Sequence, residues 1–184
     1  MDHLALTFAR YKIQIIGSGG TAEALRKLGL TVQDVSEYTG FSEMPGGLVK
    51  TLHPKIHAGI LGDWKDPAQK KYLEQNKVKA FDFVVVNLYP FEEAVRNDAE
   101  NLKNALDNID IGGVALIRAA AKGALLNKRV VPVTSPKRYR DVARDLEKDG
   151  LVSAGLRVAL AQEAFALTAG YDVAIRDYLA RSLE

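Results

Sequence analysis

The segment FDFVVVNLYPF, residues 81–91, decides the fold class of this sequence. Its first part, residues 81–86, is rich in β-branched and aromatic side chains and is apolar on both faces. A short run of this kind is typical of a parallel strand that is covered on both sides. Asn87 and Tyr89 follow at its carboxyl end, the edge where open parallel sheets bind ligands. The segment therefore predicts an α/β protein with a candidate site beside Asn87.

Strand-like and helix-like segments alternate along the rest of the chain. Further strands are predicted at residues 13–16, 32–35 and 130–133. Helices are predicted at residues 3–10, 22–28, 67–75, 114–121 and 135–146, at the starts 91–95 and 102–106, and as one or two long helices at 153–181. Residues 36–52 are predicted to form a loop because they hold several glycines and a proline. The alternation predicts a mostly parallel sheet with helices on both faces, in a single domain spanning residues 1–184.

Composition narrows the class of protein. The 184 residues are 47% hydrophobic and 26% charged, as in a soluble globular domain. A net charge of +2 gives no indication of nucleic-acid binding. The chain has no cysteine, which excludes disulfides, thiolate metal sites and a cysteine nucleophile. No segment reaches the ~20 apolar residues of a membrane span, and no signal peptide is evident, so we expect a cytoplasmic protein without a membrane partner.

The glycine-rich run Gly17–Thr21 lies between a predicted strand and a predicted helix. Backbone N–H groups at a helix N-terminus bind anions, and Ser18 and Thr21 add hydroxyl groups, so a phosphate is the natural ligand. The run is neither a Walker A loop nor a complete G-x-G-x-x-G motif. The alternative interpretation is a tight turn that needs the conformational freedom of glycine.

A second candidate is the segment KTLHPKIH, residues 50–57. Lys50 and Thr51 follow a glycine-rich loop, a position that suits an anion ligand. His53 and His57 are four residues apart, a spacing found in some zinc sites. However, no glutamate lies between them, and Pro54 is typical of a helix start, so no metal is expected. The alternative is one capping and one packed histidine.

Four further residues each have a functional and a structural interpretation. Tyr89 can donate a proton or hydrogen bond to a ligand, or it is a core tyrosine with a satisfied hydroxyl. Asp110 precedes a predicted helix, where it either caps the helix or accepts a proton from a ligand. Arg118 and Lys122 share one helix face, either at a site or as a solvated basic edge.

Five of these motifs, in this order, resemble the IMP cyclohydrolase domain of the bifunctional purine biosynthesis protein. They are GSGGTA at 17–22, KTLHP at 50–54, NLYPF at 87–91, IDIGG at 109–113 and RAAAK at 118–122. The resemblance implies a methylglyoxal-synthase-like three-layer α/β sandwich. It also implies an enzyme that closes 5-formamidoimidazole-4-carboxamide ribotide (FAICAR) to IMP with loss of water, needs no cofactor, and forms a homodimer.

The resemblance also assigns site residues. The implied catalytic residues are Lys50, Tyr89, Asp110 and Lys122. The implied substrate-binding residues are Ser18, Gly19, Gly20, Thr21, Thr51, Asn87, Ile111 and Gly112. No metal ligand is implied.

The sequence departs from the family pattern in several places. The family begins with a further strand and a Ser-Asp-Lys-Thr-Gly-type loop, whereas residues 1–16 fill the helix and strand that follow it, so unpaired backbone is expected. Leu48 replaces a common arginine, and Gly123-Ala124 replaces a common Asn-His. The family's transformylase domain is also absent, so FAICAR comes from a separate AICAR transformylase or the chain is one piece of a longer protein.

Two other functions fit the same fold. One is a non-catalytic domain that binds a phosphorylated nucleotide as a sensor, which needs only the phosphate loop. The other is methylglyoxal synthase, which is expected to carry acidic catalytic residues near that loop, and the sequence shows none there.

Overall fold

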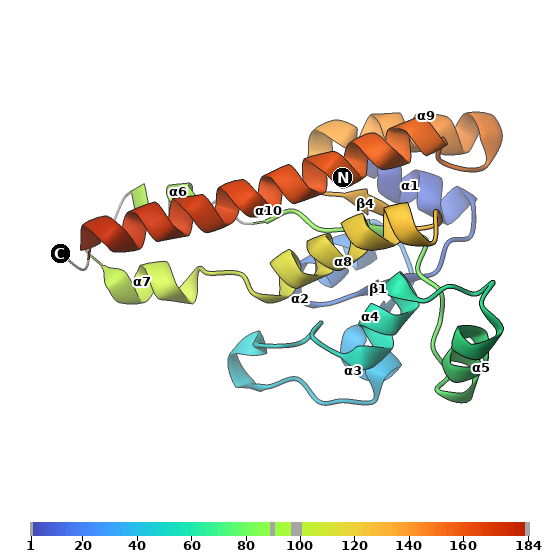
Figure 1. Ribbon diagram of the computed structural model, residues 1–184, viewed down its shortest axis with the longest axis horizontal. Coiled ribbons are helices and arrows are strands. Elements are labelled where there is room, and N and C mark those ends of the chain that lie inside the picture. The colour runs from blue at the N-terminus through green and yellow to red at the C-terminus, as the bar shows by residue number, and fades with distance from the viewer. Residues whose placement is uncertain (1, 89–90, 97–100, 183–184) are drawn as a thin grey trace.

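The computed structural model describes residues 2–88, 91–96 and 101–182 of the chain (Figure 1). The described strands form two parallel pairs: β1 (Ile15–Gly17) with β2 (Val32–Asp34), and β3 (Phe83–Val85) with β4 (Val131–Val133). The predicted parallel strands are therefore confirmed. The described part of the sheet is interrupted, however, because no ladder joins the two pairs.

The β3–β4 pair shows why a proline is tolerated inside a strand. The Val131 N–H donates to the Asp82 carbonyl at 2.8 Å, and the Val86 N–H donates to the Val133 carbonyl at 3.0 Å. In a parallel ladder successive residues point to opposite edges, so Pro132 points away from β3. Its missing N–H therefore costs no ladder hydrogen bond.

Helices make up most of the described chain. They are α1 (Asp2–Arg10), α2 (Gly19–Lys27), α3 (Val35–Thr39), α4 (Pro54–Leu61), α5 (Pro67–Gln75), α6 (Phe91–Arg96), α7 (Leu102–Asp107), α8 (Gly112–Leu126), α9 (Tyr139–Asp149) and α10 (Ala154–Ser182), with 3-10 turns η1 (Pro45–Gly47) and η2 (Pro136–Arg138). The helix predicted at 67–75 has the predicted bounds, and the C-terminal segment is a single helix. None of the described helices combines the length and the apolarity that a bilayer crossing requires.

The prediction that residues 36–52 form a loop is wrong in its first part. Val35 and Tyr38 are one helical turn apart and both are buried, so α3 forms to bury them against the strands. Gly40 adopts φ 75° directly after α3. This left-handed conformation favours glycine and ends the helix, so Gly40 is a C-cap.

Helices cover the strands on both sides, which confirms the predicted three-layer arrangement. On one side a core cluster unites α1, β4 and α9, with Leu4, Phe8, Val131, Val142 and Leu146 among its members. On the other side a second cluster unites α3, α4 and α8 with Val84 of β3. In Figure 1, α9 lies above the strands, and α3 and α4 lie below them.

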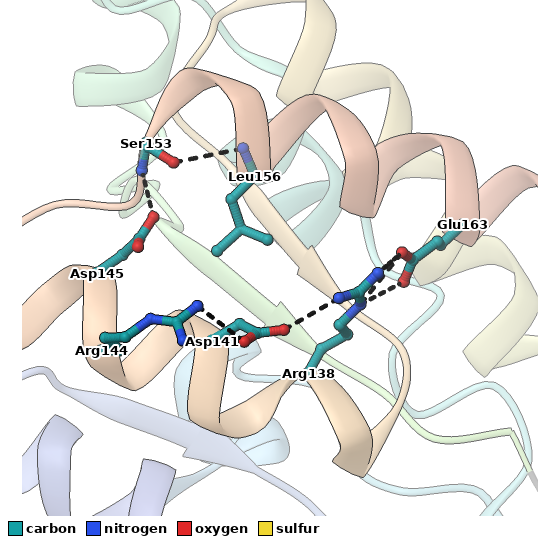
Figure 2. Close-up of polar contacts among 7 residues, drawn as sticks. All are labelled: Arg138, Asp141, Arg144, Asp145, Ser153, Leu156 and Glu163. Carbon is teal, nitrogen blue, oxygen red and sulfur yellow. Dashed lines mark hydrogen bonds and ion pairs between the residues drawn. The ribbon is translucent and has the colours of Figure 1, made fainter.

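The long helix α10 is fixed to α9 by polar contacts near its start (Figure 2). Arg138 donates through Nε to both carboxylate oxygens of Glu163 on α10, at 3.1 Å each, and pairs with Asp141 at 3.0 Å. The Ser153 N–H, just before α10, donates to Asp145 at 3.0 Å. Further along, Tyr171 and Tyr178 of α10 pack against Phe91 of α6. The helix thereby brings Tyr171 to the segment that precedes α8.

Candidate active site

The first part of the site is the N-terminus of α2. The backbone passes from β1 through Ser18, in an extended conformation, into Gly19 with φ 52°. Glycine adopts this left-handed conformation without the steric cost of a Cβ atom. The Ser18 side chain makes no capping hydrogen bond. Its hydroxyl and the first N–H groups of the helix therefore suit an anion.

Lys50 reaches this helix N-terminus from the segment after η1. Its Nζ lies 3.7 Å from the position that a Cβ atom on Gly19 would occupy. The same ammonium forms an ion pair with Glu43 at 3.1 Å. The side chain is partly buried, 23% exposed, so this charge is less screened than one on a fully exposed lysine. An anion at α2 would meet the Lys50 ammonium directly.

Thr51 connects the same segment to a second helix N-terminus, that of α8. Its Oγ1 lies 2.8 Å from the position that a Cβ atom on Gly112 would occupy. Glycine at 112 thus permits a close approach that any other side chain would obstruct. Lys50 and Thr51 therefore join the start of α2 to the start of α8. The predicted residues Gly19, Lys50, Thr51 and Gly112 lie together.

Asp110 caps α8, as one of its two interpretations predicts. Its Oδ1 accepts a hydrogen bond from the Gly113 N–H at 2.7 Å. The Asp110 N–H donates to the Tyr171 hydroxyl at 2.8 Å, and that hydroxyl donates to the Asn108 carbonyl at 3.2 Å. Burial raises the pKa of Tyr171 above 10, which keeps the hydroxyl protonated. Asp110 is thus held at its carboxylate by the Gly113 N–H and at its backbone N–H by the Tyr171 hydroxyl.

Asn87 and Ile111 lie at the ends of the elements that meet here. The Asn87 amide donates to the Tyr139 hydroxyl at 2.7 Å, which fixes its side chain beside the carboxyl end of β3. Ile111, between Asp110 and α8, is exposed, as are Gly20 and Thr21 on α2. Tyr89 lies outside the described residues.

Lys122 lies apart from this group. It follows Gly112 by ten positions on the continuous helix α8, which places it about 15 Å along the axis at ~1.5 Å per residue. It lines a separate hollow of about 610 Å³ with Leu61, Arg118, Ala119, Leu125, Leu126 and Phe165. The structure therefore does not bring Lys122 to Asp110 within this chain.

The residues after Lys122 explain one departure from the family pattern. A Cβ atom on Gly123 would lie 2.8 Å from the Ile60 carbonyl oxygen, because α8 packs closely on α4 there. Ala124 is buried against α10. Polar side chains at 123 and 124 would have no room in this packing.

The two histidines that follow the Lys50–Thr51 segment have structural contacts. The His53 ring accepts a hydrogen bond from the Lys55 N–H at 3.1 Å and so caps α4. His57 is hydrogen-bonded to the Thr51 backbone. Its Nε2 atom is buried and has no hydrogen-bond partner in the described structure. The prediction of one capping and one packed histidine is confirmed.

His57 gives stability a specific pH dependence. Burial lowers the pKa of His57 below 6.5, and the hydrogen bond to the Thr51 backbone offsets part of that effect. The unfolded chain therefore binds this proton at higher pH than the folded chain, so stability falls as the pH drops below about 6.5. When the pH is lowered from about 7.5 to about 5.5, the melting temperature should fall less for the His57→Gln variant than for the parent protein. Melting temperatures of both proteins measure this, and equal losses would contradict it.

Sequence reasoning missed two residues of the site. Tyr171 contacts Asp110 from 61 positions away along the chain. Glu43 pairs with Lys50 from a loop whose path the sequence does not determine. Both contacts depend on tertiary structure, so no local sequence pattern predicts them.

These observations define an α/β domain with a candidate anion site at the carboxyl ends of β1 and β3, between the N-termini of two helices. Comparison with known families agrees with this class. A family model described as an MGS-like domain matches residues 1–115, and one described as the AICARFT/IMPCHase bienzyme matches residues 120–184. The chain belongs to the MGS-like domain family.

Individual relatives extend the comparison. The bifunctional purine biosynthesis protein PurH of Bartonella tribocorum is 45% identical over 177 residues, which is 96% of this chain and 32% of the relative. PurH of Prochlorococcus marinus is 46% identical over 171 residues, 93% of this chain and 32% of the relative. The chain thus spans about a third of these relatives. A crystal structure of ForH superposes with a TM-score of 0.81 at 27% identity, covering 97% of this chain and 92% of that one.

Proposed function

We propose that this domain is an IMP cyclohydrolase, which closes FAICAR to IMP with loss of water. The observation that carries the proposal is the Lys50–Thr51 segment, which joins the start of α2 to the start of α8. One ribotide can then place its phosphate at one helix N-terminus and its base at the other. The similarity to bifunctional purine biosynthesis proteins supports a purine ribotide as the ligand.

The phosphate is proposed to lie at α2, where N–H groups, hydroxyls and the Lys50 ammonium converge. The residues proposed for this end are Ser18, Gly19, Gly20, Thr21, Lys50 and Thr51. The base is proposed to lie at the start of α8, near Asn87, Ile111 and Gly112. The Lys50 ammonium has three N–H donors, so it can bind the phosphate while it stays paired with Glu43.

The chemistry needs positioning and proton transfer. The carboxamide nitrogen attacks the formyl carbon within one bound molecule, so holding the two groups in contact supplies much of the acceleration. Asp110 is proposed to accept the proton from that nitrogen. The formyl oxygen takes up the proton removed from the carboxamide nitrogen and becomes a hydroxyl group. This hydroxyl then leaves as water with a second proton, while the formamido nitrogen gives up its own proton and forms the ring C=N bond. Lys122 is proposed to stabilise the charge on that oxygen, and Tyr89 is proposed to orient the base. Both of these roles rest only on the sequence motifs.

The proposal is tested by incubating the protein separately with FAICAR and with dihydroxyacetone phosphate and following the absorbance of the products. We expect IMP from the first compound and no product from the second. Methylglyoxal formation without IMP would assign a different reaction to the same fold.

A nucleotide-sensing domain is the second candidate, and the position of Lys122 favours it. The residues for phosphate lie together, whereas Lys122 lies in a separate hollow of the same chain. Lys122→Ala distinguishes the two functions. If the domain is catalytic, this variant should lower FAICAR turnover about 10²-fold or more while IMP affinity changes little. A parent protein that binds IMP and never converts FAICAR would be a sensor.

Gly112 provides a test of the close approach between Thr51 and α8. A Cβ atom at 112 would meet Thr51 Oγ1 at 2.8 Å, so Gly112→Ala should displace Thr51 and lower IMP affinity about tenfold, the equivalent of one lost hydrogen bond. Calorimetric titration measures this. The matched control is Gly155→Ala at the start of α10, where a Cβ atom would meet nothing within 4 Å. Equal affinities for both variants would show that Thr51 does not contact the ligand site.

A further inference from the structure

Val49, directly before Lys50, has a backbone conformation that its side chain disfavours. Its φ is 55°, in the left-handed region, where a β-branched side chain has a steric cost. In the described part of the chain this conformation also occurs two residues beyond the ends of α1, α5 and α8, at Lys12, Lys77 and Lys128. Left-handed backbone commonly ends a helix at that position. Val49 instead follows the extended residue Leu48, so the end of a helix does not account for its conformation.

Side-chain packing does not hold Val49 in this conformation either. Val49 is 54% exposed, and the neighbouring Leu48 is exposed as well. Disfavoured backbone conformations persist only where the surrounding structure imposes them, and they cluster at binding and active sites. The left-handed conformation therefore serves the path of the backbone and not the burial of the valine.

Val49 begins the turn that carries Lys50 and Thr51. The Leu52 N–H donates to the Val49 carbonyl at 3.1 Å, which closes a four-residue turn with Lys50 and Thr51 at its two central positions. The Lys50 side chain folds back from this turn over Gly47, where a Cβ atom would lie 2.6 Å from Lys50 Cε. Rotation about φ of Val49 would turn this whole unit relative to the glycines before it. The value of φ thus sets the direction in which both side chains leave the turn.

We propose that Val49 is a positioning residue for the anion site. Its left-handed backbone directs Lys50 toward the start of α2 and Thr51 toward the start of α8, where both side chains lie. Binding then does not have to order the turn, which is the general advantage of a preorganised site. The inference rests on the proposed ribotide site and adds the backbone feature that sets its geometry.

Val49→Pro tests the direction of the backbone. Proline fixes φ near −65° and so excludes the value of 55°. Leu48 has φ −66° and ψ 150°, which a residue before proline prefers, and within the described residues the Val49 N–H donates no backbone hydrogen bond. The substitution therefore conflicts with the structure only at φ of residue 49. Affinity for IMP should fall about tenfold or more, while the melting temperature changes by less than about 2 °C. Calorimetric titration and thermal unfolding measure the two properties.

The matched variants are Val49→Gly and Val49→Asn, because both residues tolerate a positive φ. Each should bind IMP within about threefold of the parent and should not lower the melting temperature. Lys77→Gly provides the control away from the site, since Lys77 has φ 52° on the exposed end of α5. It should leave IMP affinity unchanged.

The outcomes separate this inference from the proposed function. If Lys50→Ala weakens IMP binding but Val49→Pro binds IMP as tightly as the parent, the positioning role of Val49 is wrong and the site remains. Equal losses of affinity in the proline and glycine variants would also overturn it, because the valine side chain and not the backbone direction would then matter. A parent protein that binds neither IMP nor inorganic phosphate would contradict the proposed function and this inference together.

Discussion

Replacing Lys50 with alanine should lower kcat/KM for FAICAR about 10²-fold, and affinity for IMP by a similar factor. Lys50 brings its ammonium to within 3.7 Å of a Cβ position on Gly19, at the start of α2. A charge-assisted hydrogen bond to a phosphate contributes about 1.5–3 kcal/mol, and each 1.4 kcal/mol is about a factor of ten. Steady-state kinetics and IMP titration measure both effects.

The control for Lys50→Ala is Lys71→Ala, on the exposed surface of α5, which should leave both constants unchanged. Lys50→Ala should weaken ligand binding but leave the melting temperature nearly unchanged. The Lys50–Glu43 pair is partly exposed, and such pairs contribute little to stability. If Lys50→Ala bound IMP as tightly as the parent, the phosphate would not lie at α2.

Replacing Asp110 with asparagine should separate capping from proton transfer. Asparagine retains an oxygen that can accept the Gly113 N–H, so the cap survives and stability should change by only a few tenths of a kcal/mol. The amide cannot accept a proton at neutral pH. Turnover of FAICAR should therefore fall about 10²–10⁴-fold, the usual contribution of a general base. Denaturant unfolding and steady-state kinetics measure the two properties.

Asp110→Ala is the matched variant, because it removes both functions. It should lose the same activity as the asparagine variant and, in addition, about 1 kcal/mol of stability through the lost cap. An asparagine variant with parental turnover would leave Asp110 with a structural role only.

Much of the fold could be predicted from hydrophobic patterns. The run at residues 81–86 predicted β3, and the polar helix at 67–75 begins and ends where its proline and amphipathic pattern indicate. α3 was missed because it is a five-residue helix whose two buried side chains look like isolated apolar residues in a glycine-rich stretch. α8 extends beyond the predicted 114–121, since its last turn is held by packing on α4 and α10, which no local pattern reports.

The candidate site was predictable where a motif carries its own geometry. Glycines before a helix indicate a close approach, and Gly19 and Gly112 are the positions that Lys50 and Thr51 reach. The expectation of unpaired backbone agrees with the described strands, because no ladder joins β1 to β3. The distance of Lys122 from Asp110 could not be predicted, because it depends on α8 being one continuous helix.

The most direct test of the central claim is the conversion of FAICAR by the purified chain, with the product identified by mass and by co-elution with IMP. The account predicts formation of IMP, with loss of one water, at a rate far above the uncatalysed background. It also predicts that Asp110→Asn and Lys50→Ala reduce this rate in the same preparation conditions. Tight binding of IMP with no conversion of FAICAR above background would contradict the proposed activity and assign the site to nucleotide sensing.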